Sequence, residues 1–302
     1  MIEGKSGFPD LLEAEAFVLA SEASYNDAVR EAGRRILGNE RFRMATLAGP
    51  SCSGKTTTAN RLSAMFAKEG RDLHIISIDD FFYGRHEIQR RAKEMGEEPD
   101  YETVKAIDLD LFRSTVEAIR RGGEVKVPTF DFTLGERGAY RTFCADHDDF
   151  FLFEGIQAVY PEITSILGHS DCLSIFIEAR SSLKIGSEIF LPPEIRFFRR
   201  LVRDYKFRAS SPHFIFDIWE NVRKNEVTNI YPYADESDVH IDSTMAYGIN
   251  MLKPELQPIL DSMKKDMEFG EKAIGLLDKI RDIQPIPSHL LPENSVFHEF
   301  LG

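Results

Sequence analysis

The sequence predicts an α/β fold of three layers, in which a central and mostly parallel sheet lies between helices. Three observations predict it. An apolar segment, 42–48, leads through a glycine-rich loop into residues 57–68, whose apolar side chains recur at helical spacing. Two segments, the mostly apolar 73–78 and the continuous apolar run 150–153, are typical of buried strands. Both runs end in acidic residues, which places polar chemistry beyond the carboxyl ends of the strands.

Length and composition fit one large α/β domain. The 302 residues are 42% hydrophobic and 29% charged, an ordinary globular balance with ample core. A net charge of −13 argues against nucleic-acid binding, which normally needs a basic surface. Three widely spaced cysteines predict neither a disulfide framework nor a zinc site. Because we find no signal peptide and no apolar run long enough to span a membrane, we expect a cytoplasmic protein without a membrane partner.

The loop at residues 49–57 matches the phosphate-binding pattern G-x-x-x-x-G-K-[ST]. Its glycines let successive backbone N–H groups face phosphate oxygens, and the following helix adds the positive end of its dipole. The Lys55 ammonium can reach the β- and γ-phosphates, and the Thr56 hydroxyl can ligate Mg²⁺. A chance glycine-rich turn is the alternative, which the flanking strand and helix disfavour. The residues expected to bind ATP here are Gly49, Ser51, Cys52, Ser53, Gly54, Lys55, Thr56 and Thr57.

Acidic side chains follow two of the predicted strands. Asp79 and Asp80 come directly after the strand at 73–78, and Glu154 ends the run at 150–153. Carboxylates at these places are positioned for chemistry near the phosphates, and Glu154 is where a Mg²⁺-holding acid would stand. The alternatives are a helix cap or a solvated turn.

The segments around these strands can be assigned from periodicity and turn residues. Residues 10–37 form a helix that stops at Gly38 and packs on the outside of the domain; partner binding is its alternative role. Residues 84–100 are polar and are expected to form a mobile excursion. Asp108 is expected to cap a helix that closes at Gly122 and Gly123. Further strands are expected at 124–132, 140–143, 173–177 and 239–241.

The most basic stretch lies in an otherwise acidic chain. Arg196, Arg199, Arg200 and Arg203 recur at i, i+3, i+4 and i+7, which puts them on one helical face. Guanidinium groups suit two-point contact with phosphate oxygens, so we expect a catalytic lid at about 181–225. A solvated helix face paired with acids is the alternative. The single tryptophan, Trp219, is expected in the core.

We expect a single domain over residues 1–302. It comprises a helical arm at 1–40, a core at 41–245 that includes the lid, and C-terminal helices with a tail at 246–302. Helical periodicity is present at 243–252 and 255–281, and the prolines beyond them predict a non-helical tail.

Together these motifs resemble the uridine kinase/phosphoribulokinase family. The resemblance spans about 40–245 and rests on the glycine-rich loop and on four blocks: Ile78-Asp79-Asp80-Phe81-Phe82, Pro128-Thr129-Phe130-Asp131-Phe132, Phe153-Glu154-Gly155-Ile156 and Arg199-Arg200-Leu201-Val202-Arg203-Asp204. It is closest to a bacterial branch in which a uridine kinase-like domain often follows a TGS domain and an editing domain. That closer likeness rests on the longer segment between Ile177 and Arg196, on Ile230-Tyr231-Pro232, and on the tail with Ile286-Pro287 and Glu299-Phe300-Leu301-Gly302. Neither domain precedes the motifs here, so no tRNA-related role is expected.

The resemblance implies roles for particular residues. Asp79 matches the carboxylate that accepts the proton of the acceptor hydroxyl, and Glu154 matches the acid that helps to hold Mg²⁺. Tyr101 and Glu102 stand where the family places an aromatic residue against the base and an acid on the ribose. The remaining matches are Phe82 and Phe130 in the acceptor site and the lid arginines Arg200, Arg203 and Arg208, with Lys55, Asp79, Arg200 and Arg203 as the catalytic set.

The sequence also departs from the family pattern. Pyrimidine-specific members have a tyrosine where this chain has Phe130 and a histidine where it has Gly135. The lid lacks the usual glycine-arginine, having Ala209-Ser210 instead, so one phosphate contact is either missing or supplied by Arg196 or Lys206.

The predicted activity is phosphoryl transfer from ATP, with Mg²⁺, to a hydroxyl of a small sugar-containing acceptor such as uridine. One alternative keeps the fold but changes the acceptor to a sugar phosphate or a vitamin precursor, for which Lys105, Arg137 and Arg141 would be the extra cations. Another is a nucleotide-binding switch protein without a small acceptor. A homo-oligomer is compatible with the family, and ATP and the acceptor are the expected partners.

Overall fold

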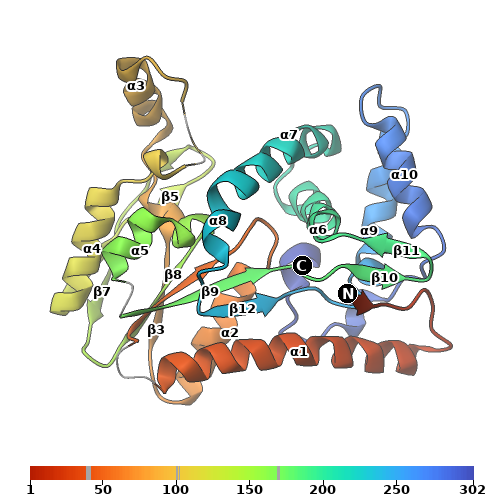
Figure 1. Cartoon of the computed structure of the whole chain (residues 1–302), viewed down its shortest axis with the longest axis horizontal. Coiled ribbons are helices and arrows are strands. Elements are labelled where there is room, and N and C mark those ends of the chain that lie inside the picture. Colours follow the sequence, from red (N-terminus) through yellow and green to blue (C-terminus); the bar gives the residue numbers. More distant parts are fainter. Residues whose placement is uncertain (39–41, 100, 102, 169–170) are drawn as a thin grey trace.

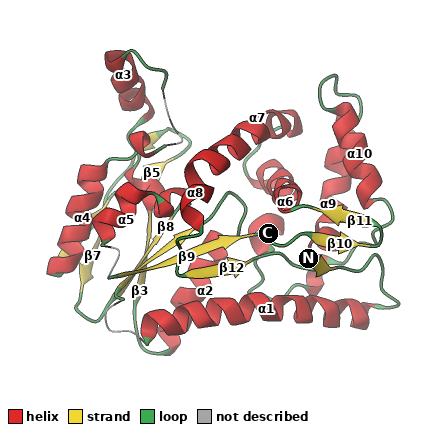
Figure 2. Cartoon of the chain, in the orientation of Figure 1, coloured by secondary structure: helices red, strands yellow, loops and turns green. Residues whose placement is uncertain are grey.

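The computed structural model describes residues 1–38, 42–99, 101, 103–168 and 171–302. In this part of the chain, a five-stranded sheet has the order β12-β9-β2-β8-β3 (Figures 1 and 2). Every neighbouring pair in it is parallel. Its strands are β2 (Met44–Ala48), β3 (Leu73–Ser77), β8 (Phe150–Glu154), β9 (Cys172–Glu178) and β12 (Val239–Asp242). The predicted α/β fold with a central parallel sheet is confirmed.

The sheet separates two hydrophobic cores. Ala45 and Leu47 of β2 join one core together with α1 (Leu11–Leu37) and α2 (Lys55–Lys68). Met44 and Ala48 join the other, together with α4 (Leu109–Arg121) and α5 (Pro161–Leu167). Because successive side chains of a strand point to opposite faces, a strand covered on both faces must be apolar throughout.

The predicted N-terminal helix is confirmed as α1, with Asp10 as its cap and Gly38 at its end. The Asp10 carboxylate accepts a hydrogen bond from the Glu13 N–H at 2.9 Å. A short strand that the sequence did not indicate, β1 (Ile2–Glu3), precedes the helix and pairs with β10 (Leu183–Ile185). Two residues carry too little periodicity to be recognised as a strand.

The segment expected as a mobile excursion at 84–100 is instead largely helical: α3 spans Arg85–Met95. The α3 helix is polar because it projects from the body of the molecule (Figure 1). Ion pairs join Arg90 to Glu87 and Glu94 along the exposed surface, and Gly96 ends the helix with a φ of 69°. Opposite charges at i+3 and i+4 and a glycine suited to the left-handed conformation both indicate a helix. The expectation of an excursion relied on the polarity of the segment and did not use these signals.

The strand expected over 124–132 is two strands. β4 (Gly123–Val127) pairs with β7 (Arg141–Ala145), and β5 (Phe130–Asp131) pairs with β6 (Glu136–Arg137). Pro128 lies at the break, since proline has no N–H to contribute to a ladder. The expected cap of α4 is confirmed, because the Asp108 carboxylate accepts from the Leu111 N–H at 3.0 Å.

The C-terminal helices differ from the expectation in their bounds. α9 (Gly248–Met263) runs through Pro254 and Pro258, and α10 (Gly270–Ile280) follows. The prolines do not end α9, because its buried residues, among them Leu252 and Leu256, pack into the core. The remaining elements are η1 (Ile78–Phe81), η2 (Val104–Ala106), η3 (Ile156–Val159), β11 (Glu188–Phe190), α6 (Pro192–Phe207), α7 (Pro212–Asn225), η4 (Glu226–Ile230), α8 (Tyr231–Ala234), η5 (Ser288–Leu290) and α11 (His298–Leu301).

Candidate active site

The glycine-rich loop joins β2 to α2 at the carboxyl edge of the sheet. Cys52 and Gly54 have positive φ angles of 61° and 96°, which curl the loop. Gly49 admits no side chain, because a Cβ there would lie 2.0 Å from the carbonyl oxygen of Ile177 in β9. The close approach of β9 therefore requires glycine at this position, and the curled backbone is the form that presents N–H groups to an anion.

Lys55 folds back over this loop. Its ammonium donates to the carbonyl oxygens of Gly49 at 2.8 Å and of Pro50 at 3.2 Å. Burial lowers the pKa of Lys55, and three nearby carboxylates act against that shift. Both carbonyl acceptors are neutral, so a phosphate oxygen would be a stronger partner for the same ammonium.

Asp79 and Glu154 meet at the carboxyl ends of neighbouring strands. Ser77 of β3 is in register with Glu154 of β8, and Asp79 follows in η1. Burial, and secondarily the charge of Glu154, raise the pKa of Asp79 to about 6, against an ordinary value of 3.8. The adjacency of these two acids follows from the parallel strand order.

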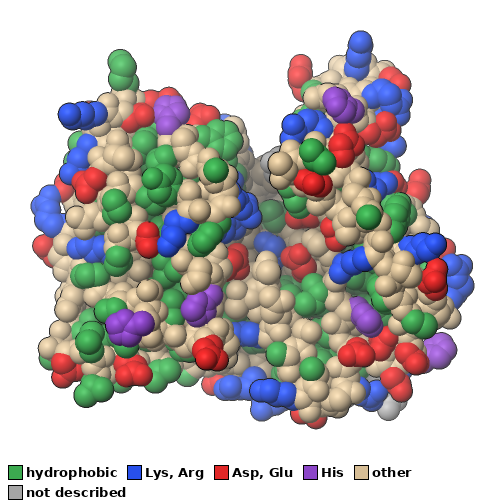
Figure 3. All heavy atoms as spheres, turned by 180° about the vertical axis from the view of Figure 1, so that it is seen from behind, with side chains coloured by type: hydrophobic (Ala, Val, Ile, Leu, Met, Phe, Trp, Pro, Cys, Tyr) green, Lys and Arg blue, Asp and Glu red, His purple; other side chains and the backbone are tan. Residues whose placement is uncertain are grey.

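Five of the residues predicted to bind ATP line one cavity of about 530 Å³, namely Ser51, Cys52, Lys55, Thr56 and Arg208, whereas Gly49, Ser53, Gly54 and Thr57 are not among its lining residues. In the space-filling view the molecule is hollowed between the part that carries α3 and the part that carries α10, and side chains of both charges gather near the hollow (Figure 3). The lining combines the loop, both acids, the end of α6 and the C-terminal tail: Ser51, Cys52, Lys55, Thr56, Asp79, Glu154, Ile156, Arg203, Phe207, Arg208, His298, Glu299 and Gly302.

Two arginines of the predicted lid face are buried and do not line the cavity. Arg196 and Arg199 are both 0% exposed. Arg196 is paired with Glu226 and donates to the Ser51 carbonyl at 3.2 Å, while Arg199 donates to the Cys52 carbonyl at 3.3 Å. These side chains brace the glycine-rich loop from outside. The expectation that Arg196 supplies a phosphate contact is therefore wrong, because its guanidinium is already held in the core.

The other basic residues of α6 differ in what they can reach. Arg200 donates to the Ser51 hydroxyl at 3.2 Å and is not among the cavity-lining residues. Lys206 is paired with Glu255 at 2.9 Å, so it is not directed at the cavity either. Arg203 and Arg208 do line the cavity, and Arg203 Nη2 is buried without a hydrogen-bond partner in the described structure. An unsatisfied guanidinium nitrogen at this place is a vacant donor for a phosphate oxygen.

The part of the cavity wall made by the tail was not predicted. His298, Glu299 and Gly302 lie about 250 residues beyond the loop that they face. No pattern in the tail indicates a contact with the loop, because such contacts depend on the path of the whole chain.

A second, smaller cavity of about 190 Å³ brings together three of the predicted acceptor residues, Phe82, Tyr101 and Phe130. The rings of Phe82 and Phe130 lie 5.8 Å apart, edge to face. Asp80 ties this wall to η1 by accepting from the Phe130 N–H at 3.1 Å. Glu102, also expected here, lies outside the described residues. The complete lining is Phe82, Tyr83, Arg85, Ile88, Tyr101, Phe130, Phe132 and Gly135.

Gly135 has a structural reason to be glycine. Its φ is 69°, and a Cβ would lie 3.0 Å from Nε of Arg85. The Arg85 N–H donates to the Gly135 carbonyl at 2.7 Å, which joins α3 to the turn between β5 and β6. The Arg85 guanidinium therefore stands beside the position where pyrimidine-specific members have a histidine. Arg85, Tyr83 and Phe132 are lining residues that the sequence analysis did not single out.

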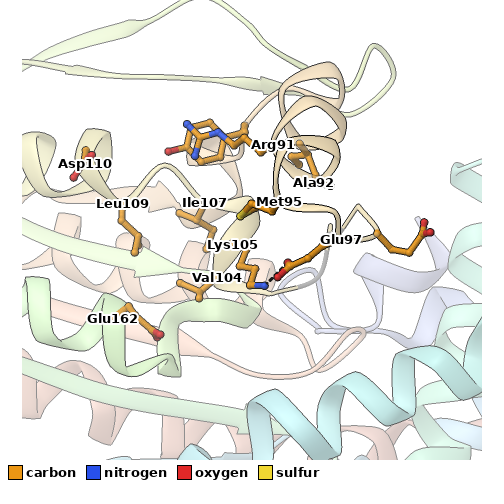
Figure 4. Close-up of a pocket in the computed structure, with 13 residues that line it drawn as sticks. Arg91, Ala92, Met95, Glu97, Val104, Lys105, Ile107, Leu109, Asp110 and Glu162 are labelled. Carbon is orange, nitrogen blue, oxygen red and sulfur yellow. Dashed lines mark hydrogen bonds and ion pairs between the residues drawn. The ribbon is translucent and has the colours of Figure 1, made fainter.

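A third cavity of about 510 Å³ lies under α3, next to the acceptor cavity. Figure 4 shows apolar side chains on its floor and the ion pair between Lys105 and Glu97 at its rim. The Arg91 guanidinium lies 3.7 Å from the ring centre of Tyr83, which lines both this cavity and the acceptor cavity. None of the predicted catalytic residues lines it.

Metal and membrane features were sought in the same part of the chain. Its His, Cys, Asp and Glu side chains form no group of three or more that could hold a metal ion. None of the described helices combines the length and the apolar character that crossing a membrane requires.

The model of the Phosphoribulokinase / Uridine kinase family matches residues 44–249, which include the sheet, the loop, both acids and α6. The chain belongs to this family. It is therefore a P-loop phosphotransferase that uses an alcohol group as acceptor. The resemblance to the bacterial branch with TGS domains stays a prediction.

Curated relatives are similar at about a quarter identity. The chain is 25% identical over 178 residues to a uridine kinase of Ureaplasma urealyticum, covering 59% of this chain and 76% of the relative. It is 26% identical over 207 residues to a uridine kinase of Deinococcus deserti, covering 68% and 90%. A solved structure of a possible uridine kinase from Bacillus stearothermophilus is 17% identical, with a TM-score of 0.46, and covers 72% of this chain and 98% of that one.

Proposed function

We propose that this kinase transfers the γ-phosphate of ATP to a hydroxyl of a nucleoside such as uridine. The observation that carries the proposal is the place of Asp79. It lines the larger cavity beside Lys55, and η1, which contains it, leads directly into Phe82 on the wall of the aromatic cavity. The cavity that we assign to the donor and the cavity that we assign to the acceptor are thus joined by one short helix, which carries a carboxylate. The uridine kinases among the relatives support the same acceptor class.

In the donor half, the loop N–H groups, Lys55 and Arg203 would bind the β- and γ-phosphates. Arg203 Nη2, buried and unpartnered, fits a phosphate oxygen. Mg²⁺ would be held by the Thr56 hydroxyl, by Glu154 and by the phosphates, and would neutralise charge on them. Both protein groups line the donor cavity, and this small number of protein oxygens suits an ion that keeps several waters.

Asp79 would orient the acceptor hydroxyl and accept its proton. With a pKa of about 6, its carboxylate is largely ionised at neutral pH and is still basic enough to serve. Arg203 and Arg208 from the end of α6 would cover the transferring group, and Arg200 would act through Ser51 in the loop.

In the acceptor half, the rings of Phe82, Tyr101 and Phe130 offer faces and edges against which a planar base can pack. Neither the tyrosine nor the histidine of pyrimidine-specific members is present. The Arg85 guanidinium, beside Gly135, is the group that would donate to carbonyl oxygens at the edge of the base.

A sugar-phosphate acceptor is less well supported, because the cations that it would need are paired. Lys105 is joined to Glu97 at 2.7 Å and Arg137 to Asp108 at 3.1 Å. Arg141 lies 3.6 Å from Asp80. An anionic acceptor would have to displace these acids.

A coupled assay of ADP release tests the proposal, run with uridine, cytidine, purine nucleosides, ribulose 5-phosphate and no acceptor. We expect stimulation by a nucleoside. Lys55→Ala should abolish nucleotide binding and turnover, whereas Lys68→Ala, at the far end of the same helix, should leave both intact. Release that no acceptor stimulates would sink the kinase proposal and favour the switch protein, while stimulation by ribulose 5-phosphate alone would favour the sugar-phosphate acceptor.

A further inference from the structure

The C-terminal tail is anchored directly against the glycine-rich loop. Cγ2 of Val296 lies 2.5 Å from where a Cβ on Gly54 would be. Val296, Phe297 and Phe300 are fully buried. The tail is also held by Ser295, whose hydroxyl donates at 2.5 Å to the buried carboxylate of Glu22 in α1. Exposing these apolar side chains to water would be unfavourable, so the tail backbone stays packed and remains part of the wall of the donor cavity.

The same tail packs on the helix that carries the arginines. The Arg199 guanidinium lies 5.2 Å from the ring centres of both Phe297 and Phe300. This contact fixes the tail relative to α6, and between the two aromatic anchors the chain passes the mouth of the donor cavity. His298 and Glu299 line the cavity from this anchored segment, and Glu299 is the acid among them.

Glu299 faces the cations expected to bind phosphate. The charges of Lys55 and Arg203 both act on its carboxylate. Oε1 of Glu299 lies 3.8 Å from Nη1 of Arg203, a distance that allows an ion pair but not a hydrogen bond. Oε2 of Glu299 and Nη2 of Arg203 are both buried without a hydrogen-bond partner in the described residues. The Glu299 carboxylate and the Arg203 guanidinium therefore attract each other, but each keeps an atom that could still form a hydrogen bond.

We propose that the Glu299 carboxylate competes with the phosphates of the nucleotide for Arg203 and Lys55, so that the tail sets the affinity of the donor site. A phosphate can satisfy the Arg203 fork with two hydrogen bonds, which Glu299 does not. The exchange needs only rotation of the Glu299 side chain, because the backbone on either side stays packed. This inference rests on the donor cavity assigned under the proposed function.

The test is a direct measurement of binding without acceptor. Dissociation constants of Mg²⁺-ADP and of a non-hydrolysable Mg²⁺-ATP analogue are measured by calorimetry for the wild type and for Glu299→Gln, which keeps the shape and removes the charge. We expect both nucleotides to bind roughly tenfold more tightly, because the substitution removes a negative charge that has the same sign as the phosphates. Glu255→Gln is the matched control, since Glu255 pairs with Lys206 of the same helix but does not line the cavity; its affinity should equal that of the wild type.

A double-mutant cycle separates competition from a change in packing. If Glu299 competes for Arg203, the gain from Glu299→Gln must shrink when Arg203 is already replaced by Gln. An unchanged or weaker affinity in Glu299→Gln, or a gain that is the same with and without Arg203, overturns the inference. If the wild type binds nucleotide in a way that depends on Lys55, and Glu299→Gln does not change the affinity, this inference alone is refuted. Wild-type protein that binds no nucleotide refutes the donor site and the inference together.

Discussion

Arg196 and Glu226 form a two-point ion pair, with N–O distances of 2.5 and 2.7 Å, in which both side chains are buried. The same guanidinium donates to the Ser51 carbonyl, so the pair connects η4 to the glycine-rich loop. An arginine that the sequence marks as a phosphate ligand is thus a support of the loop that binds phosphate. An arginine that binds phosphate and an arginine that supports the loop have the same residue type and helical spacing, so only their partners in the fold distinguish them.

Removing the acid of this pair should destabilise the fold strongly. Glu226→Gln leaves the Arg196 charge buried without a counter-charge, and we expect the free energy of unfolding to fall by about 3–5 kcal/mol. Urea denaturation followed by circular dichroism measures it. Glu87→Gln, which breaks exposed pairs of α3, is the control and should leave the midpoint unchanged. A Glu226→Gln variant as stable as the wild type would show that the pair contributes little.

Activity should depend on the ionisation of Asp79. Because burial and Glu154 raise the pKa of Asp79 to about 6, kcat/KM with the best acceptor should fall about tenfold per pH unit below that value. Asp79→Asn should lose most of kcat, keep its affinity for ADP and lose this acid limb. A variant that retains near-normal kcat would exclude Asp79 as the base.

The same substitution should make the protein more stable. The folded-state pKa of Asp79 lies above its ordinary value of 3.8, so the fold favours the protonated carboxyl and loses stability as the pH rises through about 6. Asp79→Asn should therefore gain up to about 3 kcal/mol at neutral or higher pH and nothing below about pH 4. Thermal melts of both proteins across this range measure the difference. A gain that is equally large in acid would trace to another cause.

Restoring the family residue should have opposite effects on activity at Phe130 and at Gly135, the two positions of the acceptor cavity that depart from the family pattern. Phe130→Tyr adds a hydroxyl at the wall of the cavity, and we expect kcat/KM for uridine to rise roughly tenfold if it meets the base. Gly135→His should lower activity instead, because a φ of 69° is strained for a residue with a Cβ and because that Cβ would lie 3.0 Å from Nε of Arg85, which would have to move. Steady-state kinetics with uridine and cytidine compare the two. An active Gly135→His enzyme would show that the turn adjusts more easily than its geometry indicates.

Local signals in the sequence were sufficient for much of the donor site. The glycine spacing at 49–57 and the acids after two apolar runs predicted a loop and carboxylates at one sheet edge, and Lys55, Asp79 and Glu154 do line one cavity. The cap at Asp108 was equally local. These features could be predicted because each depends on neighbours within a few residues, or on the rule that parallel strands end at the same edge.

The sequence by itself therefore determined the fold class, the loop and the acids at its edge. Only the tertiary structure decided which arginines of α6 reach the cavity. Arg196 and Arg203 share one helical face, but Arg196 is enclosed with Glu226, whereas Arg203, held by Asp204 at 2.8 Å, still lines the cavity. Only the tertiary structure brought Glu299 into the same cavity as Lys55 as well. Such contacts join residues far apart in the chain, and their formation depends on the packing of every element between them.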